Sequence, residues 1–60
     1  MNNLKRAIID SKIKKTEICK QAEISRTHLF YLENDMRKPS FEVMRSLSRI
    51  LNKTCEELFF

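Results

Sequence analysis

The chain has 60 residues, of which 42% are hydrophobic, and it carries a formal net charge of +4. A chain of this length has room for one small core, so we expect residues 1–60 to form a single domain. It has no glycine and one proline, whereas a sheet protein needs turn residues roughly every eight to twelve positions. The composition therefore predicts an all-α fold, a compact bundle of short helices.

Several classes of protein are excluded by simple patterns. A membrane-spanning helix needs about 20 consecutive apolar residues, and the chain has only short apolar runs such as residues 29–32. The first residues lack the apolar stretch of a secretory signal, so we expect a cytoplasmic protein with no membrane partner. In that reducing compartment, Cys19 and Cys55 are expected to be free, buried thiols. We expect no metal, because His28 is the sole histidine and the cysteines are far apart.

The positive charge is concentrated in one part of the chain. Residues 1–39 hold nine basic and five acidic side chains, and residues 40–60 hold three of each. A localised basic surplus is typical of proteins that bind a polyanion such as nucleic acid. A solvated surface that keeps the protein soluble has the same charge pattern, so charge leaves both readings open.

Apolar spacing predicts a first helix over residues 2–11. One face of this helix carries residues at helical spacing, namely Leu4, Ala7, Ile8 and Ser11. Ile9 falls outside that stripe and is expected to be exposed. In the basic connector over residues 12–14, Ile13 is expected to turn inward.

A pair of short helices follows, over residues 15–22 and 26–33. The first is expected to bury Ile18, Cys19 and Ala22, and the second to bury Leu29 and Leu32. Between them, Ser25 is a good N-cap, since its hydroxyl can accept from the free amides of the second helix. Ile24 is expected to anchor the entry to that helix.

Residues 34–39 read as a loop, because Asn and Asp favour turns and a proline ends the segment. Ser40 is expected to cap a fourth helix over residues 41–51, whose inner face carries Phe41, Met44, Leu47, Ser48 and Leu51. Asn52 suits a left-handed helix end. Thr54 and Glu57 have the spacing of a capping box, which predicts a fifth helical turn with Leu58, Phe59 and Phe60.

Two short helices joined by a tight turn form a helix-turn-helix. Residues 17–29, EICKQAEISRTHL, resemble the lambda-repressor-like (Cro/CI-type, XRE) helix-turn-helix family. The resemblance extends from about residue 4 to residue 59 and includes the steps Leu32-Glu33-Asn34, Lys38-Pro39-Ser40, Leu51-Asn52 and Glu56-Glu57-Leu58-Phe59. It implies a bundle of five helices and sequence-specific binding of double-stranded DNA by a transcriptional regulator of the repressor type.

The resemblance also implies roles for individual residues. The helix over about residues 25–33 would enter the major groove, where the residues that read base edges would be Arg26, Thr27, His28 and Tyr31. Contacts to the DNA phosphates would come from Lys15, Ser25, Asn34, Arg37 and Lys38. The family usually forms dimers through its C-terminal region, so a homodimer is expected with Phe59 and Phe60 at the interface. Packing of these two aromatics on their own domain is the open alternative.

The sequence departs from the family at two places. Glu23 occupies a turn position that is often glycine, and a left-handed conformation costs a non-glycine residue roughly 1–2 kcal/mol, so the turn is expected to relax. Ile8 occupies the place of an arginine that commonly pairs with the acid matching Glu33. We therefore expect Glu33 to pair with Lys5, Arg6 or Lys12, or to face solvent.

A second function is open on the same fold. Phe30 and Tyr31 form an adjacent aromatic pair, and protein interfaces are enriched in such residues. The domain would then be a protein-interaction module, such as an antitoxin or an anti-repressor, with a regulatory protein as its partner. No catalytic acid–base pair, glycine-rich phosphate loop or metal cluster is present in the sequence, so we expect no enzyme, no cofactor and no small-molecule substrate.

Overall fold

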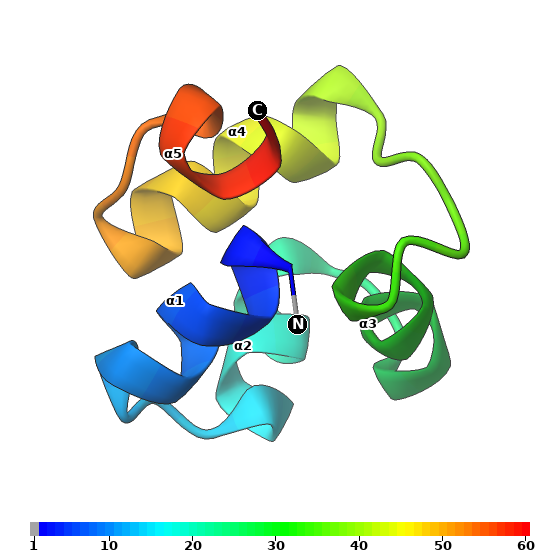
Figure 1. Ribbon diagram of the computed structural model, residues 1–60. Coiled ribbons are helices and arrows are strands. Elements are labelled where there is room, and N and C mark those ends of the chain that lie inside the picture. Colours follow the sequence, from blue (N-terminus) through cyan, green and yellow to red (C-terminus); the bar gives the residue numbers. More distant parts are fainter. Residues whose placement is uncertain (1) are drawn as a thin grey trace.

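The computed structural model describes residues 2–60, and within this range it contains five short helices and no strand (Figure 1). The helices are α1 Asn3–Ser11, α2 Lys15–Ala22, α3 Arg26–Glu33, α4 Phe41–Leu51 and α5 Cys55–Phe59. The predicted all-α bundle of five helices is confirmed, and the predicted bounds agree to within one residue for α1 to α4. No described helix is long and apolar enough to cross a membrane.

A single cluster of apolar side chains lies between the five helices. Helix α2 packs against both α3 and α4, and α5 closes the cluster by packing on α1 and α4. The buried residues are Leu4, Ala7, Ile8, Ile18, Cys19, Ala22, Leu29, Leu32, Leu47, Leu51 and Leu58. Ile13 and Ile24 turn inward from the connectors and pack against this cluster, as predicted. The helical periodicity thus identified nearly every core position.

Side-chain caps satisfy the free amides at the start of four helices. Ser25 accepts from the His28 amide at 3.0 Å, and Ser40 accepts from the Val43 amide at 3.2 Å. Asn2 caps α1 in the same way. The predicted capping box begins α5: the Thr54 hydroxyl accepts from the Glu57 amide while the Glu57 carboxylate accepts from the Thr54 amide. Hydrogen bonds to the Glu57 carboxylate, first from the backbone amide of Thr54 and then from its side chain, hold the pKa of Glu57 below its ordinary value.

Left-handed residues end the helices, although the chain has no glycine. Lys12, Glu23 and Asn52 occupy this conformation at the C-terminal ends of α1, α2 and α4, and Asp35 does so just after α3. Asn52 behaves as predicted. Glu23 has φ 57°, so the turn after α2 keeps its tight geometry and does not relax as expected. The short connections that arrange α2 and α3 therefore depend on a strained residue.

The expected burial of Phe41 is wrong. Its side chain is 83% exposed, and the partly buried residues of α4 that pack on the core include Val43 and Ile50. Phe41 is the first residue of α4, and the Cα–Cβ bonds of a helix tilt toward its N-terminus. The ring therefore lies at the very start of the helix, and its exposed fraction shows that no neighbouring helix covers it. Helical spacing placed Phe41 on the inner stripe but carried no information about this end effect.

Glycine in place of the strained Glu23 should stabilise the protein. We expect Glu23→Gly to raise the free energy of unfolding by about 1 kcal/mol, because glycine adopts φ near 57° without a steric penalty. Urea unfolding followed by circular dichroism would show a higher midpoint at an unchanged slope. Gln21→Gly is the matched control, since Gln21 is an exposed residue inside α2, and it should destabilise by roughly 0.5–1 kcal/mol. Equal effects of the two variants would contradict a local strain at Glu23.

Candidate nucleic-acid interface

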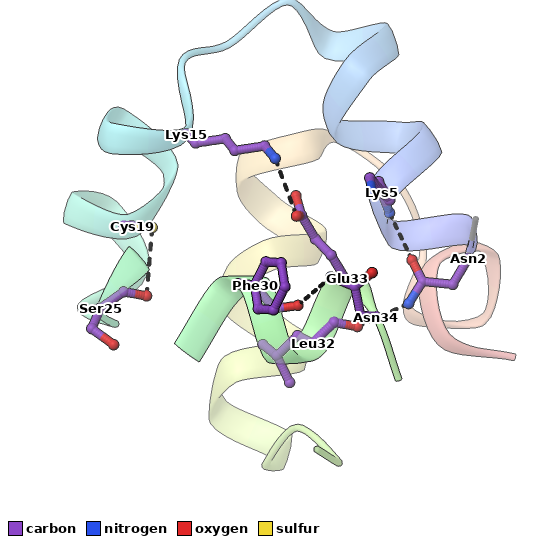
Figure 2. Close-up of polar contacts among 9 residues, drawn as sticks. All are labelled: Asn2, Lys5, Lys15, Cys19, Ser25, Phe30, Leu32, Glu33 and Asn34. Atoms are coloured by element: carbon purple, nitrogen blue, oxygen red, sulfur yellow. Dashed lines mark hydrogen bonds and ion pairs between the residues drawn. The ribbon is translucent and has the colours of Figure 1, made fainter. Parts of the chain in front are cut away.

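The connection between α2 and α3 is short and held by hydrogen bonds from both helices. The Ile24 amide donates to the Cys19 carbonyl at 3.0 Å, which closes the end of α2 around left-handed Glu23. The Cys19 thiol donates to the Ser25 carbonyl at 3.7 Å, as Figure 2 shows. Within the same connection, the Ile24 side chain packs against the apolar core. These contacts orient α3 relative to α2 in a helix-turn-helix.

Cys19 has a structural role in this turn. Its side chain is buried, and burial is the main reason that the pKa of its thiol is raised, although the positive charge of Arg26 opposes the shift. The thiol is therefore protonated at neutral pH and able to donate to Ser25. Both cysteines are free as predicted, but Cys55 is only partly buried.

Helix α3 separates a buried side from an exposed one. Leu29 and Leu32 lie in the core, whereas Arg26 and Thr27 in its first turn are exposed. Tyr31 lies one turn beyond Thr27 and is 36% exposed. His28 is half-buried at the edge of this surface, where it lines a hollow with Glu42 and Val43 of α4. The predicted base-reading residues therefore come together on and beside one exposed surface.

The residues predicted to contact phosphate are in different situations. Ser25 is exposed, and beside its hydroxyl the amides of Arg26 and Thr27 at the start of α3 have no acceptor within the helix. Arg37 and Lys38 are exposed on the loop between α3 and α4. The Asn34 side chain donates to the Phe30 carbonyl at 2.8 Å, and its backbone amide bonds to the same oxygen, so both groups serve the end of α3 (Figure 2).

The model of the Helix-turn-helix family matches residues 4–58 of the chain. This match covers almost the whole chain and agrees with the geometry of α2 and α3. The chain belongs to the lambda-repressor-like (XRE) helix-turn-helix family. No curated protein and no solved structure gives a significant match. Membership assigns this helix-turn-helix domain to a class of DNA-binding regulatory domains that are not typically enzymes, with double-stranded DNA as the partner.

Within this helix-turn-helix domain, the expected partners of Glu33 are wrong. Its carboxylate is only 3% exposed and pairs with Lys15, whose Nζ lies 3.1 Å from Oε2 (Figure 2). Ile8, at the place where the family commonly has an arginine, is buried as an apolar core residue. Lys15 at the start of α2 therefore supplies the positive charge from a different helix. The structure thus draws Lys15, a predicted phosphate ligand, into an internal ion pair, although 37% of its side chain remains exposed.

The ion pair satisfies Glu33 incompletely. In the part of the chain that the structure describes, the second carboxylate oxygen, Oε1, has no hydrogen-bond partner. A buried carboxylate without a cation is strongly unfavourable, so Lys15 is the contact that allows a charged Glu33 in this position. The pair also ties the start of α2 to the end of α3.

Sequence reasoning missed one contact that shapes the same region. The Asn2 side chain donates to the Leu32 carbonyl at 2.8 Å and to the Asp35 carboxylate at 3.0 Å. It thereby joins the start of α1 to the end of α3 (Figure 2). The helical pattern placed Asn2 only at the start of the first helix, and these partners are 30 and 33 positions away, where no local pattern indicates them. Within residues 2–60, no group of acidic, His or Cys side chains could hold a metal ion.

Removal of the Lys15 ammonium should destabilise the domain. We expect Lys15→Met to lower the free energy of unfolding by about 2 kcal/mol, less than the loss of a fully buried partner because water reaches this lysine. Lys14→Met is the matched control, since Lys14 is exposed, and it should change stability by less than about 0.5 kcal/mol. The double variant Lys15→Met/Glu33→Leu should recover most of the loss. Urea unfolding measures all three, and a Lys15→Met variant as stable as the control would show that the pair does not contribute.

Proposed function

We propose that this domain is a sequence-specific transcriptional regulator that inserts α3 into the major groove and represses by occupying its DNA site. The observation that carries the proposal is the two-sided character of α3. Leu29 and Leu32 anchor one side completely in the core, and Arg26 and Thr27 are exposed beside the N-terminal end. A helix held in this way presents its first turn to base edges without moving.

The exposed side chains suit base recognition. Arg26 has a planar guanidinium that pairs with O6 and N7 of guanine through two hydrogen bonds. Thr27 offers a methyl group to thymine and a hydroxyl to a base edge, and Tyr31 extends the same surface by one turn. His28 contributes at the margin, since it is half-buried against α4.

The phosphate contacts would flank this surface. Ser25 and the free amides at the start of α3 form one anion site, to which Lys15 adds its partly exposed ammonium. Arg37 and Lys38 would hold the second stretch of backbone, with Asn34 contributing through the loop that it stabilises. Such contacts position the domain on the duplex, whereas the side chains of α3 supply specificity.

A homodimer would double the sequence that is read. A few base-reading side chains, at about 1–3 kcal/mol each, discriminate only weakly among sites. Two copies on half-sites about 34 Å apart would combine their specificity. Phe60 is 84% exposed and is the better candidate for the interface, because Phe59 packs partly on its own core.

Binding to random duplexes tests the DNA-binding mode. Fluorescence anisotropy at about 50 and 200 mM salt should show at least a tenfold loss of affinity, and selection from the pool should enrich one half-site pattern. Arg26→Ala should relax the preference at one base pair by about 1–3 kcal/mol, because its guanidinium reads that pair. Lys38→Ala should weaken binding to all sequences alike and lower the salt slope by about 1.

Lys53→Ala is the matched control for loss of a positive charge. Lys53 is exposed and belongs to the connection between α4 and α5. In Figure 1 this orange connection lies on the opposite side of the molecule from α3. It should leave both affinity and specificity unchanged. If the wild-type protein binds no duplex even at low salt, the α3 surface is not a DNA reader. The aromatic pair Phe30 and Tyr31, whose ring centroids are 6.1 Å apart on this helix, then becomes the docking site for a protein partner.

The dimer predicts a separate effect of the C-terminal aromatic. We expect Phe60→Asp to convert a dimer to a monomer in sedimentation experiments, because a carboxylate cannot be buried at an apolar interface. Binding to a single half-site should stay the same, whereas affinity for a two-half-site duplex should fall about tenfold or more. Ile9→Asp, which changes an exposed residue of α1, is the control and should stay dimeric. An Ile9→Asp protein that dissociates instead would place the interface on α1.

A further inference from the structure

A surface hollow of about 490 Å³ lies between the N-terminal residues, the loop after α3 and the end of α5. We call it the loop hollow. Its apolar lining includes Met36, Pro39, Leu58 and Phe60, and Arg37 and Lys38 line it as well. Its volume is in the range of sites that take a ligand or a partner's side chains, roughly 300–1,000 Å³. None of the base-reading residues of α3 lines it.

Hydrogen bonds hold the loop beside the hollow in place. The Met36 amide donates to the Tyr31 carbonyl at 2.9 Å, which closes the end of α3 around left-handed Asp35. Asn2 binds both the Leu32 carbonyl and the Asp35 carboxylate from the opposite wall. The backbone of this wall is therefore held in place before any partner arrives, so that little backbone entropy is lost on binding.

The charge around the hollow favours an anionic partner. Among its lining residues, Arg37 and Lys38 are basic and Asp35 is the one acid. The Asp35 carboxylate already accepts a hydrogen bond from Asn2. In the described part of the chain neither Arg37 nor Lys38 forms an ion pair, since the one that is present joins Lys15 to Glu33. The two cations are therefore available to carboxylates from outside.

The apolar walls distinguish a peptide from a nucleic acid. Met36 is 64% exposed, and Phe60, which is also the candidate for the dimer interface, is 84% exposed in a single copy. A phosphate backbone could pair with the two cations but would leave these side chains in water. A peptide with a bulky apolar residue beside acidic ones would use both features. Met, aromatic residues and Arg are also the types that are enriched at protein interfaces.

We propose that the loop hollow binds an acidic segment of a regulatory protein, with a large apolar side chain in the hollow and adjacent carboxylates on Arg37 and Lys38. The same two cations are the proposed ligands of the DNA backbone. A bound segment and a bound duplex would therefore compete, a consequence that rests on the proposed function. Neither Phe30 nor Tyr31 lines the loop hollow. The proposal therefore places the contact with an anti-repressor protein on a different part of the domain from this aromatic pair.

Selection of peptides tests the hollow without any reference to DNA. The probe is a phage-displayed pool of random 12-residue peptides, selected on the immobilised wild-type protein and counter-selected on Met36→Asp. We expect enrichment of peptides that combine Leu, Phe, Ile or Trp with neighbouring Asp or Glu. A synthetic copy of an enriched peptide should bind at least tenfold more weakly to Lys38→Glu, because the reversed charge repels its carboxylates.

Two matched variants separate the hollow from general effects of charge and stability. Lys20→Glu makes the same charge reversal on an exposed residue of α2 that does not line the hollow, and Ile9→Asp places a new carboxylate on α1. Both should bind the peptide as the wild type does, and circular dichroism should show that all four variants are folded. A failure to enrich acidic and apolar peptides, or equal binding by Lys38→Glu and Lys20→Glu, would overturn the proposal.

A competition experiment links the hollow to DNA binding. Addition of the selected peptide at tenfold its Kd should raise the apparent Kd for the selected duplex about elevenfold, as expected for mutually exclusive ligands. If the protein binds the peptide but no duplex, the hollow stands and the proposed DNA-binding mode fails. Simultaneous binding of the peptide and the duplex would show that the two do not compete, and would contradict this consequence of the proposal. A wild-type dimer that Met36→Asp dissociates would overturn the proposal itself, because a second copy would then fill the hollow.

Discussion

The short turn between α2 and α3 is the constraint on which the rest of the structure depends. Glu23 takes a left-handed conformation, the Ile24 amide returns to the Cys19 carbonyl, and the Cys19 thiol bonds to the Ser25 carbonyl. Ser25 then caps α3, so the same three-residue connection ends one helix and begins the next. Because α3 is anchored in this way at its N-terminal end, its first turn is held firmly, and in the proposed function this turn would face the bases of DNA.

The Lys15–Glu33 pair fastens the other end of α3. An apolar residue at position 8 leaves the buried Glu33 without a cation from α1, and α2 provides one instead. A buried ion pair contributes little net stability, but loss of either partner leaves an uncompensated charge. In the proposed function the same ammonium lies near the phosphate backbone, so the contact that stabilises the fold and the contact that grips DNA would share one side chain.

Neighbouring surfaces of a very small domain carry the proposed interactions, and Phe60, the candidate for the dimer interface, also lines the loop hollow. Base recognition would use the exposed side of α3, and dimer formation would use the C-terminal aromatic. The loop between α3 and α4 is the point where they meet, since Arg37 and Lys38 face both the proposed DNA backbone and the loop hollow. A regulatory protein could therefore displace this domain from DNA by placing a peptide segment in the loop hollow, without any contact to the base-reading residues of α3. The left-handed Asp35 and the Asn2 hydrogen bonds hold this loop in the shape on which both proposed contacts depend.

The sequence by itself determined the helices, their caps and most of the core, because these depend on residues within one or two turns of each other. Ser25, Ser40 and the Thr54–Glu57 box act as their spacing predicts. The family motif also located the exposed surface of α3, whose contacts with DNA remain predictions. Only the tertiary structure decided that Phe41 is exposed, that Glu33 pairs with Lys15, and that a hollow opens beside Arg37 and Lys38. Each of these depends on which distant elements become neighbours, and the periodicity of a single helix carries no record of its neighbours.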